Sequence, residues 1–244
     1  MRISKTLVLI VVTLMAGTAF ADQEVSRYSD VPQGTEPTPW VGGPVTPGES
    51  VRALAFWTDR TLFDAAFPGL PTEDWSATLV APGTILSCTP PLNSTTNDAC
   101  FATGTVLPGL ELAVNVTSGG GDYVVLGAGA FGNTNVLVGP NSFPDDVVFN
   151  FDPAVRAVGF DLVNPGTPGT SYSVEIFGPG GSLGTTTAID GAEGNFWGVD
   201  STDIGGITSI VFDGGGLSDG AELTTLVTFG GEPVPVELQS FSIE

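Results

Sequence analysis

The feature that most constrains this chain is an alternation of apolar and polar residues with a period of two. Between residues 110 and 117 the apolar side chains Leu110, Leu112, Val114 and Val116 alternate with mostly polar ones. Side chains of a β-strand point alternately to two faces, so this pattern predicts a strand with one buried face. The same period indicates further strands over 147–151, 158–162, 172–176, 207–212 and 223–229.

Glycine and proline punctuate these segments. The 244 residues include 34 Gly and 19 Pro, and glycine-rich turns such as 178–181 and 214–216 separate neighbouring strand candidates. Short strands joined by frequent turns are typical of antiparallel all-β domains. We therefore expect an all-β fold, an antiparallel β-sandwich of jelly-roll-like architecture.

One short segment follows a helical period instead. Between residues 58 and 67 an apolar pair recurs at a spacing of four, Thr58 or Asp59 can cap the N-terminus, and Pro68-Gly69 ends the segment. The sequence predicts one short amphipathic helix near the start of the domain.

The first 21 residues have the pattern of a secretory signal peptide. A basic start at Arg2 and Lys5 precedes an apolar run and the small-residue cleavage site Ala19-Phe20-Ala21. Residues 22–50 are polar and rich in proline, which indicates a flexible lead-in, so we expect a single sandwich domain over 51–244. The sequence predicts a secreted, extracellular protein without a membrane anchor in the mature chain.

The charge of the chain restricts its partners. Removal of residues 1–21 leaves four arginines against 27 acidic residues, a formal charge of −23. Such a surface repels nucleic acid and anionic membranes, whereas it attracts cations. The chain also contains no histidine, which excludes catalytic systems and metal sites that depend on imidazole.

Two cysteines, Cys88 and Cys100, enclose a polar segment of 11 residues. In an oxidising compartment this arrangement favours a disulfide that closes the loop, with a stabilising effect of roughly 3 kcal/mol. A two-cysteine metal site is the alternative, but the chain has no histidine to complete it.

The segment Gly127-Ala-Gly-Ala-Phe-Gly132 matches the glycine pattern of dinucleotide-binding loops. That function needs a helix after the third glycine, where the helix N-terminus holds the pyrophosphate. Here a strand-like run and a Gly-Pro turn follow. We interpret the segment as a glycine-rich connection between strands.

Clustered acids make calcium the cofactor most consistent with the composition, in a structural role. Asp213, Asp219 and Glu222 gather carboxylates in one glycine-rich stretch, and Ca²⁺ prefers such oxygen ligands. The alternative is a plain acidic turn.

Two tryptophans, Trp40 and Trp75, occur in polar contexts and are candidates for stacking on sugar rings. Trp57 and Trp197 lie in apolar contexts, which indicates core packing.

Several segments, in their order along the chain, resemble exported bacterial β-sandwich proteins of the PEP-CTERM type. They are 151–161, 172–177, 195–199 and 207–212, with a further similarity at 56–66. The resemblance implies a jelly-roll-like domain at the cell surface or in the extracellular polysaccharide matrix. The C-terminal sorting tail of that type is missing, and Ala221-Glu-Leu-Thr224 stands where many members carry an Asp-Asn pair.

These observations lead to two functional hypotheses. The first is a secreted, non-enzymatic β-sandwich protein of the matrix or cell surface that binds extracellular polysaccharide. The alternative is a secreted glycan-active hydrolase that uses two carboxylates, for which Glu73 with Asp74, Asp145 with Asp146, and Asp200 with Asp203 are the neighbouring pairs.

Overall fold

The computed structural model describes residues 54–115, 121–201, 205–214 and 222–232. The chain divides into two units, 1–35 and 36–244, and all described residues belong to the second. The predicted signal peptide, the lead-in at 22–50, Trp40, Asp203 and Asp219 lie outside the described residues. The first described strand begins at Leu54, close to the predicted start of the domain.

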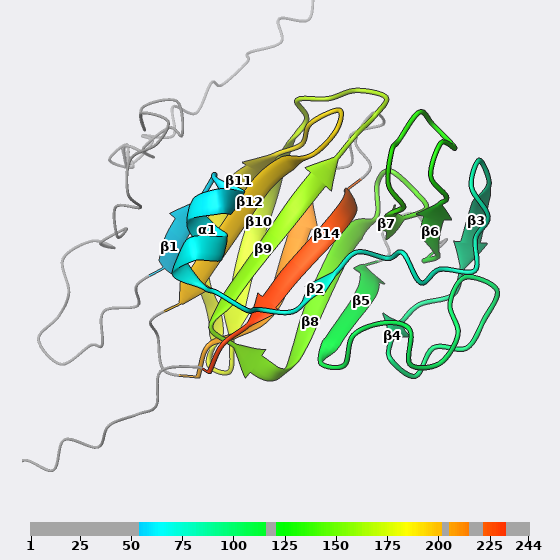
Figure 1. Ribbon diagram of the computed structural model, residues 1–244. Coiled ribbons are helices and arrows are strands. Elements are labelled where there is room, and N and C mark those ends of the chain that lie inside the picture. Colours follow the sequence, from blue (N-terminus) through cyan, green and yellow to red (C-terminus); the bar gives the residue numbers. More distant parts are fainter. Residues whose placement is uncertain (1–53, 116–120, 202–204, 215–221, 233–244) are drawn as a thin grey trace, which may run out of the picture. The chain divides into compact units, whose positions relative to one another are not determined.

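Two antiparallel sheets form the domain, as the sequence predicts (Figure 1). The eight-stranded sheet has the order β1 (Leu54–Trp57), β12 (Asn195–Ser201), β9 (Ala157–Val163), β14 (Leu223–Gly230), β7 (Leu137–Pro140), β6 (Tyr123–Leu126) and β3 (Ile85–Cys88), and β2 (Thr72–Glu73) pairs with β14. The six-stranded sheet has the order β11 (Gly181–Ile189), β10 (Ser171–Gly178), β13 (Ile207–Asp213), β8 (Asp146–Val155), β5 (Leu110–Asn115) and β4 (Leu92–Asn93). From β8 onward the chain passes repeatedly from one sheet to the other, as in jelly-roll domains.

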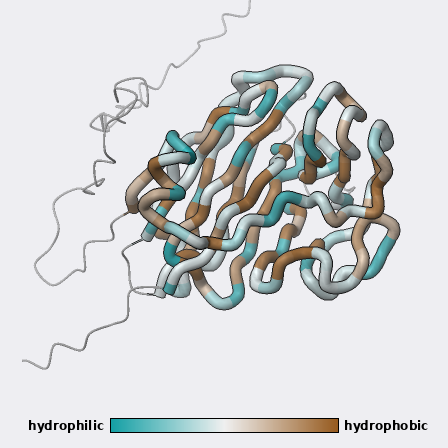
Figure 2. The backbone as a smooth tube through the Cα atoms, viewed as in Figure 1, coloured by the Kyte–Doolittle hydropathy of each residue, from teal (hydrophilic) through white to brown (hydrophobic). Residues whose placement is uncertain are grey.

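The core lies between the sheets and follows the predicted alternation. In the first half of β8 the buried residues are Val147, Phe149 and Phe151, and a more exposed residue separates each from the next. Phe149 packs with its ring centroid 4.8 Å from that of Phe160 on the opposite sheet. Figure 2 shows hydrophobic and hydrophilic positions alternating along the long strands. Trp197 is 2% exposed and belongs to this core, which confirms its predicted place.

The predicted helix is present as α1 (Arg60–Ala66), and Asp59 caps it by accepting a hydrogen bond from the backbone N–H of Leu62. It covers the outer face of the eight-stranded sheet at β12 and β1 (Figure 1). Phe63 packs over Gly159 and its cross-strand partner Gly198, where a side chain of any larger residue would collide with an aromatic ring. The packing of Phe63 against these two glycines therefore helps to position the helix on the sheet.

Arg60 fastens the same helix to the sheet. Its Nε lies 3.1 Å from Asp161 Oδ2 on β9, and its guanidinium lies over the ring of Phe196, 4.6 Å from the centroid.

Among the described residues no helix has the length and apolar character needed to span a membrane.

Candidate cation site

Three carboxylates lie near one another at one end of the sandwich, and each comes from the end of a strand or the residue beside it. Asp146 is the first residue of β8, Asp213 is the last residue of β13, and Glu222 directly precedes β14. Because β8 and β13 are antiparallel neighbours, the start of one strand lies beside the end of the other. The topology therefore gathers residues that are far apart in the sequence.

The first member, Asp146, lies on the outer face of the six-stranded sheet. Its cross-strand partner on β5 is Asn115, whose Nδ2 donates a hydrogen bond of 3.0 Å to Asp146 Oδ2. Burial raises the pKa of Asp146, and the adjacent carboxyl of Asp213 raises it further. The side chain is thus held in place by an amide on one side and faces a like charge on the other.

Glu222 differs from the other two because it is buried. Its residue is 1% exposed, and neither carboxylate oxygen has a hydrogen-bond partner within the described part of the chain. Its Oε1 lies so close to Gly214 that a Cβ there would collide with it. A glycine at position 214 is therefore required for the carboxylate to reach this place.

Burial raises the pKa of Glu222 to about 8, and the charges of Asp146 and Asp213 contribute to the rise. The backbone N–H groups of Glu222 and Gly214 partly offset the rise, although neither makes a hydrogen bond of full geometry. Burying an uncompensated carboxylate is costly, so the group must either take up a proton or be neutralised by a cation. Carboxylate oxygens are the ligands that Ca²⁺ prefers.

The two described calcium candidates of the sequence, Asp213 and Glu222, are thus brought together. Asp146 was missed as their partner, because the sequence offers it only as the neighbour of Asp145. Asp146 directly precedes the strand expected at 147–151, and Asp213 directly follows the one expected at 207–212, but the sequence does not tell that these two strands pair.

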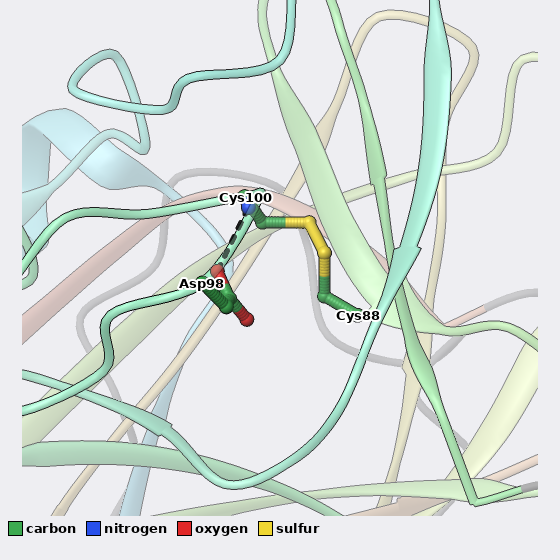
Figure 3. A group of neighbouring side chains, drawn as sticks. All are labelled: Cys88, Asp98 and Cys100. Atoms are coloured by element: carbon green, nitrogen blue, oxygen red, sulfur yellow. Dashed lines mark hydrogen bonds between the residues drawn. A yellow bond between two sulfur atoms is a disulfide. The ribbon is translucent and has the colours of Figure 1, made fainter.

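The predicted disulfide between Cys88 and Cys100 is confirmed, with a Cα–Cα distance of 6.3 Å. Figure 3 shows Asp98 beside the bridge. In the described chain these three residues also form the set of ligating atoms that lie within 4.8 Å of one another. Because both sulfur atoms are bonded to each other, they are not thiolate ligands, and the metal alternative for this pair is wrong for the oxidised protein.

Asp98 instead organises the loop that the disulfide closes. Its Oδ1 accepts hydrogen bonds from the backbone N–H groups of Cys100 at 2.7 Å and Phe101 at 2.9 Å. Its Oδ2 accepts one from the hydroxyl of Tyr123 at 3.0 Å. The carboxylate is therefore used for structure.

The prediction that Trp75 presents a face to a sugar is wrong. Trp75 is 0% exposed and packs against Phe101, with ring centroids 6.3 Å apart. The polar neighbours that suggested exposure point elsewhere, since Glu73 accepts hydrogen bonds from the backbone N–H groups of Trp75 and Leu107. The pair Glu73 and Asp74 is thereby accounted for in part by backbone capping.

The glycine pattern at 127–132 is a connection between strands, as expected. It follows β6, and no helix lies between residue 127 and the start of β7. Gly127 lies against the carbonyl oxygen of Ala81, where a Cβ would collide, and Gly129 and Gly132 have φ values of 84° and 80°. Each glycine has a structural reason of its own.

No family model matches the chain, and neither the curated proteins nor the solved structures include a significant match.

Proposed function

We propose that this chain is an exported, non-enzymatic β-sandwich protein of the extracellular matrix or cell surface, with a structural Ca²⁺ ion bound by Asp146, Asp213 and Glu222. The observation that carries the cation is Glu222, whose carboxylate is buried and lacks hydrogen-bond partners among the described residues. A divalent cation would neutralise this charge and the repulsion from the two aspartates.

Binding would draw the three side chains closer together. The only set of ligating atoms within 4.8 Å in the described residues is the one at the disulfide, so these carboxylates are more widely spaced. Asp213 lies exposed at the end of β13, whereas Glu222 is buried and packed against Gly214. Glu222 therefore sets the position of the ion, and the two aspartates complete its ligands.

The location of the protein is part of the proposal. The disulfide supports an oxidising compartment, because such bonds persist mainly outside the cytoplasm. The two-sheet fold is compatible with the resemblance to the PEP-CTERM type, and that resemblance supports a place in the polysaccharide matrix.

Burial also argues against the hydrolase alternative at this site. A raised pKa is what a general acid of a glycosidase needs, and Glu222 has one. A general acid must, however, reach the glycosidic oxygen, and Glu222 is 1% exposed. The geometry favours a bound ion over catalysis.

Thermal unfolding of the full secreted chain with CaCl₂ or EDTA tests the cation. We expect Ca²⁺ to raise Tm, with a stabilisation of about 2.7 kcal/mol when its concentration is 100 times Kd. Glu222→Gln should abolish the effect, because it removes a charged ligand at nearly constant shape. Glu175→Gln on β10 is the matched control and should respond like the wild type.

A wild-type Tm that is unchanged between EDTA and millimolar Ca²⁺ would overturn the cation proposal. Turnover of chromogenic glycosides by the wild type, lost in Glu222→Gln, would overturn the non-enzymatic one.

A further inference from the structure

An open groove lies on the outer face of the six-stranded sheet, away from the acidic end. Its volume is about 430 Å³, and it runs across β4, β5 and β8. Most of the described residues that line it have hydrogen-bonding side chains: Asn93, Ser94, Thr95, Glu111, Asn150 and Asp152. Gly109 and Leu110 complete the lining.

The floor of the groove is a row of three side chains across three strands. Glu111 on β5 is the cross-strand partner of Asn93 on β4 and of Asn150 on β8. Asn93 Nδ2 donates to Glu111 Oε2 at 3.1 Å, and Asn150 Nδ2 donates to Glu111 Oε1 at 3.2 Å. The carboxylate thereby orients both amides within the sheet.

The two walls of the groove are held by further contacts. On one side, the backbone N–H and the hydroxyl of Thr95 both donate to Asn93 Oδ1, at 2.9 and 2.7 Å. On the other side, the backbone N–H of Asp152 donates to the carbonyl of Gly109 at 3.1 Å. Gly109 has a φ of 86°, and a Cβ there would lie 3.1 Å from the carbonyl oxygen of Asp152. Because these contacts already order the groove, binding of a ligand costs little conformational entropy of the protein.

The chemistry of the lining selects the class of ligand. Amides, hydroxyls and carboxylates arranged side by side match the vicinal hydroxyl groups of a sugar, which both donate and accept hydrogen bonds. The two carboxylates, Glu111 and Asp152, and the acidic chain repel uronic acids and phosphates. The described lining contains no aromatic ring, so recognition depends on hydrogen bonds.

We infer that this groove binds a neutral oligosaccharide, with the row Asn93, Glu111 and Asn150 as its contact surface. The inference rests on the proposed matrix function, since it names the class of partner, but it does not depend on the cation. On β8, Asn150 of the row and Asp146 of the acidic end are four positions apart, a distance of about 13 Å.

The test is binding of the full chain to an array of neutral oligosaccharides, with glucose, xylose, mannose and galactose backbones, and to oligogalacturonate. We expect binding to at least one neutral backbone and none to the uronate. Asn150→Ala and Glu111→Gln should each weaken binding about 10-fold, the usual effect of one lost hydrogen bond to an oriented polar group. Thr185→Ala, on β11 at the opposite edge of the sheet, is the control.

The outcomes separate this inference from the cation proposal. Binding that persists in EDTA and in Glu222→Gln while Asn150→Ala loses it supports the groove, even if Ca²⁺ has no effect on Tm. The inference is overturned if no neutral oligosaccharide binds, or if both groove variants bind like the wild type at unchanged Tm.

Discussion

Two rows of polar side chains cross β5 and β8 on the same outer face, and they use the same pair of groups. In the groove row, Glu111 on β5 accepts a hydrogen bond from Asn150 on β8. In the acidic row, the positions are exchanged, since Asn115 on β5 donates to Asp146 on β8. What differs is the third neighbour, which is the amide Asn93 in the first row and the carboxylates Asp213 and Glu222 in the second.

This difference decides what each row can bind. Each oxygen of Glu111 accepts a hydrogen bond from an amide, so its row presents a hydrogen-bonding surface with a single charge, which suits neutral hydroxyl groups. The second row concentrates negative charge, and one of its carboxylates is buried without a partner in the described structure. The outer face of the six-stranded sheet thus carries a hydrogen-bonding surface along one row and ends, four positions away along β8, beside a concentration of negative charge.

The largest expected effect is a dependence of the free energy of unfolding on pH that comes from the acidic row and not from the groove row. The folded-state pKa of Glu222 is about 8, above its ordinary value of 4.5, so the folded chain binds the proton more tightly than the unfolded chain. In EDTA, stability should therefore be highest below pH 4.5 as far as this group is concerned. It should fall by about 4 kcal/mol as the pH rises to 8.

Urea unfolding between pH 5 and 9 measures this slope. Glu222→Gln should lack it, whereas Glu111→Gln should retain it, because Glu111 belongs to the other row. An equal slope in wild type and Glu222→Gln would contradict the assignment.

The second prediction concerns a variant that disrupts the groove and leaves the acidic end intact. The loop closed by Cys88 and Cys100 contains two residues of the groove, Asn93 at the end of β4 and Thr95 just after it. The double variant Cys88→Ala, Cys100→Ala should lose about 3 kcal/mol of stability, since the unfolded loop is no longer constrained.

Below its own Tm, the same variant should lose oligosaccharide binding more than its response to Ca²⁺. Calcium-dependent Tm shifts and array binding, measured on one preparation, provide the comparison. Equal loss of both would show that the two ends are not independent.

The third prediction concerns repulsion within the acidic row. Asp146→Asn removes the charge that faces Asp213 and keeps the shape of the side chain. In EDTA at pH 7 it should stabilise the fold by about 1 kcal/mol. In CaCl₂ it should be less stable than the wild type, because a ligand is lost. Paired Tm measurements detect this change of sign, and Asp64→Asn on α1 is the control that should show none.

The smallest expected effect is on the groove itself. Asn150→Ala should change stability by less than about 1 kcal/mol, because its amide lies at a partly exposed surface. Chemical unfolding measures this value, which ensures that lost binding reflects the groove. A loss of several kcal/mol would instead identify Asn150 as a structural residue.

Features that depend on residues close together in the sequence could be predicted. The period of two predicted strands at 110–117 and 223–229, where the structure has β5 and β14. Asp59 and the apolar pairs predicted α1, and the cysteine spacing predicted the disulfide. Each depends on local geometry: the alternation of side chains along a strand, the cap of a helix and the closure of a short loop. By itself, therefore, the sequence determined the fold class and the order of its parts.

Only the tertiary structure decided which parts are neighbours. A period of two tells which face of a strand is buried, but not which strand lies beside it or in what register. Asp146 meets Asp213 and Glu222 because β8 and β13 pair, and Asn93, Glu111 and Asn150 align because β4, β5 and β8 do. Trp75 is buried by another long-range contact, since the ring of Phe101 comes from a segment 26 residues further along the chain. Both candidate sites are products of strand pairing and of the packing of one sheet on the other, which the whole core selects.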